Sequence, residues 1–239
     1  MGQHTDAANR GTNEAQTFYG RWARLYDLVA TFPGVGSWRE RTAESLDLSP
    51  GDTVVEMGCG TGANFPYLRE RVGASGTVVG VDFTRGMLDR AAVRVEERGW
   101  QNVHLVRGDA TAPPIEGPID AVLGSFVVGM LGNPAAAVEE WCSLVRPGGR
   151  IALLDASRST DPRARPLDAL FRLFVAASAP PTTRLRYSTP PWKPLDDRVA
   201  AAREPLEGRP EYAHEAFALG FVRLSSATVE RDGETPESS

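Results

Sequence analysis

The chain has few of the residues that build crosslinked, metal-bound or membrane-spanning proteins. Among 239 residues it has two cysteines, Cys59 and Cys142, which fall in different predicted elements. Two separated cysteines cannot build a disulfide framework or a zinc cluster, so we expect free thiols and no metal site. No apolar run approaches the ~20 residues of a membrane helix, and the polar segment 1–11 lacks the apolar centre of a secretion signal. The expected location is the cytoplasm.

The chain also lacks an excess of positive charge. It has 26 basic and 31 acidic side chains, a formal net charge of -5. Nucleic-acid-binding proteins usually present a basic surface to phosphates, so no nucleic-acid partner is expected. Hydrophobic residues make up 41% of the chain, enough for one sizeable core. The oligomeric state does not follow from the sequence.

Short apolar runs separated by helical segments recur through the middle of the chain. The runs are rich in Val, Ile and Leu without clean alternation, as in strands covered on both faces: Thr53 to Met57, Thr77 to Val81, Val103 to Val106, Ile119 to Leu123 and Ile151 to Leu154. Helices are expected from Ser37 to Leu46, from Asn64 to Gly73, from Thr84 to Gly99 and from Asn133 to Pro147. This alternation predicts an α/β fold with a doubly wound, mostly parallel sheet, which binds ligands beyond the carboxyl ends of its strands.

The pattern breaks after the fifth strand. Half of the 18 prolines fall between Pro162 and Pro210, which indicates an insertion, with one helix near Leu167 to Ala177. The apolar face of that helix, beside an Arg-rich stretch, would suit peripheral contact with a membrane surface, although packing into the core is the simpler interpretation. A last strand is expected near Phe221 to Ser225, followed by a polar tail.

A glycine-rich loop, Gly58-Cys59-Gly60-Thr61-Gly62, directly follows the first strand, and Glu56 lies two residues before it. Glycines let the backbone turn tightly and approach a ligand closely. A carboxylate at this position is ill suited to a pyrophosphate and well suited to a cationic ligand.

Acidic residues also end the next two strands. Asp82, after the second strand, is placed to accept hydrogen bonds from ribose hydroxyls, and Asp109, after the third, from an adenine amine. Phe83 and Met87 would supply apolar contact to the base, and Ser125 with Phe126 follows the fourth strand at the same edge. The ligand is therefore predicted to be a nucleoside with a cationic group.

These segments resemble the successive motifs of class I methyltransferases across residues 50 to 155. The motifs that carry the resemblance are Val54 to Gly62, Val81 to Leu88, Gly108-Asp109-Ala110 and Arg146 to Arg150. Within that superfamily the chain is similar to the ubiquinone/menaquinone C-methyltransferases and the phosphatidylethanolamine N-methyltransferases. That similarity is based on Tyr19, Trp22, Ala23, Tyr26 and Asp27, and on Asn64 to Leu68.

The resemblance implies a Rossmann-like methyltransferase fold that binds S-adenosylmethionine. The methionine part would be held by Glu56, Asn64 and the glycine loop (Gly58, Cys59, Gly60, Thr61 and Gly62). Asp82 would hold the ribose, and Asp109 with Ala110 the adenine. Tyr19 and Tyr26 would close the site. The expected organisation is an N-terminal tail and helical lid (1–49), a cofactor-binding core (50–156), an insertion or substrate cap (157–215), a final core strand (216–230) and a disordered tail (231–239). Such folds end in an antiparallel hairpin, and here the hairpin is expected to be missing.

The expected reaction is methyl transfer to a small or lipid-like acceptor, such as a quinone-like ring or a lipid head group. Asp155, which closes the fifth strand, is the candidate base for removing a proton from the acceptor; a loop-capping role is the alternative. A non-catalytic S-adenosylmethionine-binding sensor or assembly protein is the rival interpretation, because no other base is evident and the hairpin is expected to be absent.

Overall fold

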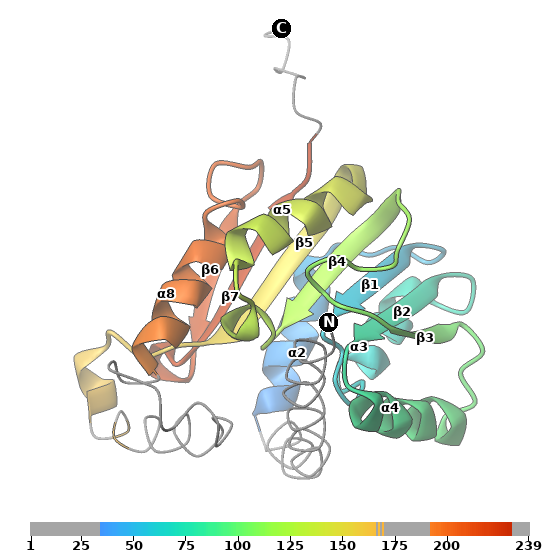
Figure 1. The fold of residues 1–239 in the computed structure, drawn as a ribbon, viewed down its shortest axis with the longest axis horizontal. Helices are drawn as coiled ribbons and strands as arrows, with labels where there is room; N and C mark the ends of the chain where they lie inside the picture. Colours follow the sequence, from blue (N-terminus) through green and yellow to red (C-terminus); the bar gives the residue numbers. More distant parts are fainter. Residues whose placement is uncertain (1–33, 166, 168, 170–191, 231–239) are drawn as a thin grey trace, which may run out of the picture.

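The computed structural model describes residues 34–165, 167, 169 and 192–230, which form a seven-stranded sheet covered by helices (Figure 1). The strand order is β3-β2-β1-β4-β5-β7-β6. Five strands run parallel: β1 (Thr53–Met57), β2 (Thr77–Asp82), β3 (Val103–Arg107), β4 (Ile119–Ser125) and β5 (Val145–Ala156). The remaining two, β6 (Ala213–Phe217) and β7 (Val222–Thr228), complete the sheet as an antiparallel pair, with β7 antiparallel to β5.

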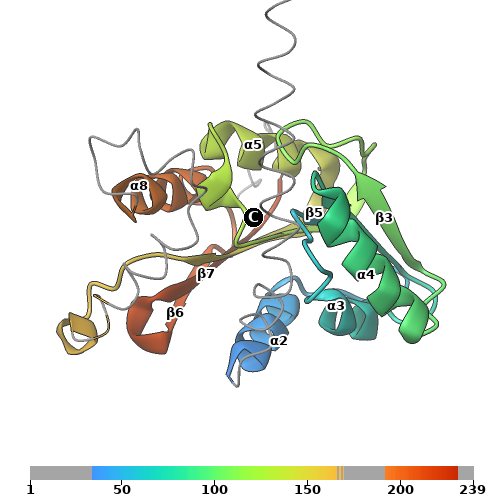
Figure 2. The same ribbon diagram turned by 60° about the horizontal axis from the view of Figure 1, so that its bottom comes forward.

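Helices cover both faces of the sheet (Figure 2). On one face lie α2 (Val35–Ser45), α3 (Phe65–Val72) and α4 (Arg85–Glu97), whose apolar side chains pack with Val54, Val78 and Leu123. On the other lie α5 (Pro134–Leu144) and α8 (Trp192–Arg203), which pack with Val55, Met57 and Leu153. Short 3-10 turns occur at Val128–Met130, Pro162–Ala164 and Ala218–Gly220. None of the helices in the described part of the chain is long and apolar enough to cross a membrane.

The chain changes direction across the sheet between β1 and β4. It runs outward from β1 to β2 and β3, then returns to β4 beside β1, where Glu56 pairs with Leu123 and Met57 with Gly124. The loops that leave these two strands diverge to opposite sides, which opens a crevice beyond their carboxyl ends. The fold therefore locates a ligand site at the glycine-rich loop and the segment after Ser125.

The mostly parallel α/β sheet predicted from the sequence is confirmed, with small shifts of the element ends. The largest shift is in β5, which begins at Val145 rather than Ile151 because α5 ends at Leu144 and the chain extends at once. Pro147 therefore lies inside the strand. Asn133 caps α5 as expected, its side chain accepting a hydrogen bond from the Ala136 amide at 3.3 Å.

The expectation of a missing hairpin is wrong. β6 and β7 form the pair, with His214 opposite Ser225 and Phe217 opposite Val222. The sequence does not predict β6, because this edge strand consists of exposed and half-buried residues and has no continuous apolar run. Most of β6 and all of α8 lie in the segment that the sequence predicts to be an insertion. In the structure α8 packs against α5 and lies beside β5. The part of the expected helical lid that precedes residue 34 lies outside the described residues, as does nearly all of the helix expected near Leu167 to Ala177.

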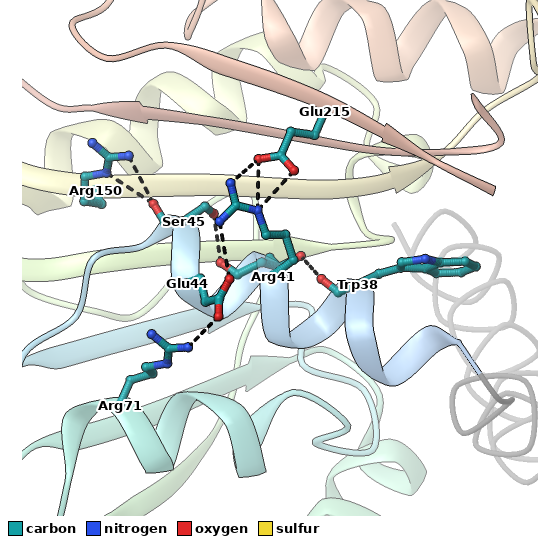
Figure 3. A network of polar contacts seen from close by, with 8 residues as sticks. Trp38, Arg41, Glu44, Ser45, Arg71, Arg150 and Glu215 are labelled. Carbon is teal, nitrogen blue, oxygen red and sulfur yellow. Dashed lines mark hydrogen bonds and ion pairs between the residues drawn. The ribbon is translucent and has the colours of Figure 1, made fainter. Parts of the chain in front are cut away.

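Helix α2 is attached to three neighbouring elements through its outward face (Figure 3). Arg41 binds both carboxylate oxygens of Glu215 on β6, at 2.6 and 3.1 Å, and Glu44 accepts from Arg71 of α3 at 3.0 Å. At the end of the helix the Ser45 carbonyl accepts from Arg150 of β5 at 3.2 Å. Each exposed pair adds little stability alone, but together they fix the helix against the sheet and α3.

Candidate active site

Three alternating glycines shape the loop between β1 and α3. Gly58, Gly60 and Gly62 have φ angles of 66°, 55° and 72°, in the left-handed region that favours glycine. A Cβ on Gly58 would collide with Val127, and one on Gly62 with the Phe65 ring, whereas one on Gly60 would have no atom within 4 Å. The outer two glycines are therefore required by packing, and Gly60 is where a ligand can approach the backbone.

Glu56 lies beside this loop in a chain of buried polar groups. The carboxylate accepts from Asn64 Nδ2 at 2.5 Å through Oε1, and Asn64 Oδ1 accepts from Arg39 Nη1 at 2.5 Å. The three residues are 1%, 3% and 6% exposed, respectively. The second carboxylate oxygen, Oε2, is buried without a hydrogen-bond partner.

Burial controls the charge of Glu56. Removal from water raises the pKa of this carboxyl group to about 8, against the lowering effects of the Asn64 hydrogen bond and of Arg39. An unsatisfied buried oxygen costs free energy unless a donor or cation meets it. The site therefore favours a ligand with a positively charged group.

Asp82 is the last residue of β2, and its side chain contacts the glycine loop. Its Oδ2 accepts from the Gly60 amide at 2.9 Å and its Oδ1 from the Thr84 amide at 2.7 Å, so the carboxylate holds the loop in place. The carboxylate also accepts from the Thr84 side chain, which leaves it capacity for one further hydrogen bond. Burial raises the pKa of Asp82, while the two amide bonds lower it.

Apolar groups lie next to Asp82, as predicted for a nucleoside site. The Phe83 side chain is 46% exposed, unusual for a large apolar group, and Met87 on the first turn of α4 is 6% exposed. The Ala110 carbonyl accepts from Trp141 Nε1 at 2.7 Å, which fixes the segment after β3. Asp109 is exposed, and its Oδ1 accepts from the amide and hydroxyl of Thr111, leaving Oδ2 toward solvent.

Ser125 and Asp155 end β4 and β5. The Ser125 hydroxyl is buried without a hydrogen-bond partner. Asp155 is 5% exposed and follows the alternation of Leu153, so it faces α8, whereas Glu56 faces α2 and α3. Burial raises the pKa of Asp155 to about 8, and Arg203 of α8 opposes that shift.

The structure thus brings Glu56, Asn64, Asp82 and the glycine loop together. The Asp155 side chain lies on the other face of the sheet, the face covered by α8. Tyr19 and Tyr26 lie outside the described residues. Sequence reasoning missed Arg39, whose guanidinium also lies 5.9 Å from the centre of the Phe126 ring. The available signal was an arginine on the same helical face as Val35 and Ala43.

The sequence that forms this crevice is similar to that of known proteins. Residues 54–149, which contain it, match the family model described as methyltransferase domain. A demethylmenaquinone methyltransferase from Mycolicibacterium gilvum is 30% identical over 231 residues, spanning 92% of this chain and 96% of that protein. The chain belongs to the class I S-adenosylmethionine-dependent methyltransferases.

Other relatives of this methyltransferase match over a shorter span. A demethylmenaquinone methyltransferase from Shouchella clausii is 33% identical over 127 residues, so the match covers 53% of this chain and about half (54%) of that relative. Among solved structures, an S-adenosylmethionine-dependent O-methyltransferase from Thermotoga maritima has a TM-score of 0.58, at 15% identity, over 88% of this chain and 71% of that one. That likeness shows the shared fold. Together the matches favour an enzyme over the non-catalytic binding protein considered from the sequence.

The residues at the crevice fit the cofactor of this methyltransferase, S-adenosylmethionine. The unpartnered Oε2 of Glu56 offers an acceptor to a cationic group, and the open space at Gly60 admits a ligand against the backbone. Asp82 retains acceptor capacity beside the exposed Phe83 ring, as a ribose and an adenine require.

Proposed function

We propose that this methyltransferase methylates a small, quinone-like or lipid-like acceptor. The observation that carries the proposal is the buried Asp155 carboxyl group, at the carboxyl end of β5. Its pKa of about 8 suits the removal of a proton from an acceptor carbon or hydroxyl near neutral pH. The relatives named demethylmenaquinone methyltransferases support a ring acceptor.

For the cofactor, we infer a division of the crevice into three parts. Glu56, Asn64 and the loop Gly58 to Gly62, including Cys59 and Thr61, bind the methionine part. Asp82 binds the ribose hydroxyls, and Phe83, Met87, Asp109 and Ala110 bind the adenine. Ser125 donates its free hydroxyl toward the ligand from the end of β4. The support is the hydrogen-bond capacity that the carboxylates and the Ser125 hydroxyl retain, together with the exposed Phe83 ring.

The chemistry requires little of the protein beyond orientation. When bound, S-adenosylmethionine supplies a methyl group made electrophilic by its sulfonium. The chain aligns the acceptor with that methyl, excludes water and takes up a proton at Asp155. Alignment of this kind can supply roughly 7 to 11 kcal/mol. Helix α8, from the segment 157–215, packs over the Asp155 side of the sheet, and we assign that segment to the acceptor.

An assay of methyl transfer tests the acceptor. The purified enzyme with S-adenosylmethionine labelled in its methyl group is incubated with a demethylated menaquinone, with phosphatidylethanolamine vesicles, and with tRNA. We expect label in the quinone extract, or in the lipid if the head group is the acceptor, and none in the RNA. Transfer to RNA alone would contradict the proposal.

Asp82→Asn tests the place of the ribose. The variant keeps the shape and loses the charge, so we expect S-adenosylmethionine binding to weaken at least tenfold, which corresponds to about 1.4 kcal/mol. Isothermal titration measures the dissociation constant. Asp89→Asn is the matched control, because Asp89 is exposed on α4 and its Oδ1 lies 3.9 Å from Arg85 Nε. Unchanged affinity in a folded Asp82→Asn protein would remove Asp82 from the site.

A further inference from the structure

Helix α2 carries an arginine on the face that packs into the protein. Val35, Arg39, Thr42 and Ala43 are its buried residues, and Arg39 is 6% exposed. Burying a guanidinium costs free energy unless its donors are used. Arg39 uses one of them on Asn64, a residue eight positions after Glu56. Arg39 is therefore connected to the Glu56 carboxylate through one intermediate side chain, that of Asn64.

The direction of these hydrogen bonds follows from the chemistry of arginine. A guanidinium has donors and no acceptor, so the Asn64 group that faces Arg39 must be the carbonyl oxygen. The amide nitrogen then necessarily faces Glu56, as the 2.5 Å contact from Nδ2 to Oε1 shows. A donor at this position favours the ionised carboxylate. The reversed amide would instead present an oxygen, which favours the protonated acid.

We propose that Arg39 is a positioning residue that fixes the Asn64 amide, and thereby orients Glu56 and favours its ionised form for the cationic end of the cofactor. The proposal rests on the proposed function of Glu56. Arg39 touches neither the cofactor nor the reacting atoms in this scheme, since it acts through Asn64.

Anchoring of α2 keeps the guanidinium in place. The outward face of the helix is bound to β6 through Arg41 and Glu215, and to α3 through Glu44 and Arg71 (Figure 3). On the inward face, Arg39 lies against the Phe126 ring beyond β4. Because the helix is fixed on its outward face and the guanidinium lies against Phe126 on the inward face, Arg39 loses little further conformational entropy when it donates to Asn64.

Other charged groups also act on Glu56. Asp82 of β2 opposes its ionisation, whereas Arg39 of α2 and Arg94 of α4 favour it; the Cys59 thiol of the glycine loop lies in the same field. Removal of Arg39 changes two of the favourable contributions at once, the charge and the orientation of Asn64. We therefore expect its loss to shift the ionisation of Glu56 toward higher pH.

The experiment compares Arg39→Leu, Arg39→Lys and Asn64→Leu with the wild type, by titration with S-adenosylmethionine from pH 6.5 to 9.5. For Arg39→Leu we expect the midpoint of the pH dependence to rise by roughly one unit, which makes binding about tenfold weaker at pH 7.5 and nearly normal at pH 9.5. Asn64→Leu is expected to shift the midpoint in the same direction. Arg39→Lys keeps the charge and should restore part of the shift.

Arg98→Leu is the control, because it removes an exposed arginine at the carboxyl end of α4, beside the Trp100 ring, and should leave the midpoint unchanged. Equal weakening at every pH in the Arg39 and Asn64 variants would show that the two residues only support the fold, and would overturn the proposal. Glu56→Gln separates the two levels. If that variant keeps the wild-type pH dependence, the role proposed for Glu56 itself fails; if it loses the dependence while the Arg39 variants do not shift it, only the positioning role fails.

Discussion

Glu56→Gln is expected to weaken S-adenosylmethionine binding at least tenfold at pH 8.5 and to abolish the pH dependence of that binding. Burial raises the pKa of Glu56 to about 8 in the free protein, so below pH 8 the carboxyl group is mostly protonated. A cationic ligand requires the ionised form, and binding must therefore release a proton. The affinity of the wild type should rise about tenfold for each pH unit up to about 8 and then level off.

Titration calorimetry in two buffers of different ionisation enthalpy measures both the affinity and the number of protons released. Glu40→Gln is the matched control, because Glu40 is an exposed glutamate on α2. We expect that control to keep both the affinity and the proton release. A Glu56→Gln protein that still released a proton on binding, with unchanged slope, would exclude Glu56 as the group that meets the cofactor.

The same shift affects stability. Because the folded-state pKa of Glu56 lies above its unfolded value, the stabilising contribution of the protonated group is complete below about pH 4. That contribution falls as the pH rises through about 8. Asp155 behaves in the same way, since burial also raises its pKa to about 8. The ionised groups in the free protein therefore lower stability at alkaline pH.

Asp155→Asn is the second change with a large expected effect. An asparagine has the shape of the protonated acid but cannot accept a proton, so we expect kcat to fall by roughly 10² to 10⁴. The wild-type rate should rise with pH and level above about 8, whereas the residual rate of the variant should not follow that ionisation. Steady-state rates from pH 6 to 9, with the acceptor that the methyl-transfer assay identifies, measure both effects.

Binding of S-adenosylmethionine to Asp155→Asn should be unchanged, since Asp155 faces α8 and Glu56 faces the opposite side of the sheet. Ser157→Ala is the control for local packing, because Ser157 is 3% exposed and two residues further along the chain. We expect that variant to retain most of its activity. A normal rate in Asp155→Asn would restrict Asp155 to a structural role, such as balancing the charge of Arg203.

Much of the fold was predictable because its signals are local. The Val-rich strands β1 and β2, the glycine loop and the asparagine cap Asn133 are each encoded within a few neighbouring residues. The acids Glu56 and Asp82 were also identifiable, since parallel strands bring their carboxyl ends to one edge. For the same reason the family resemblance was readable from motifs alone.

Other features depended on partners distant in the sequence. Strand β6 is defined by its pairing with β7 and by the bond between Glu215 and Arg41, residues 174 positions apart. Likewise, helical spacing places Arg39 on the apolar face of α2, but its partner is decided only when the fold brings Nη1 within 2.5 Å of Asn64 Oδ1. The sequence by itself determined the order of elements from α2 to β5, the glycine-rich loop and the acids beside it. Only the tertiary structure decided which of them are buried, what they contact and how burial changes their charge, because desolvation and long-range contacts arise when the sheet and helices pack together.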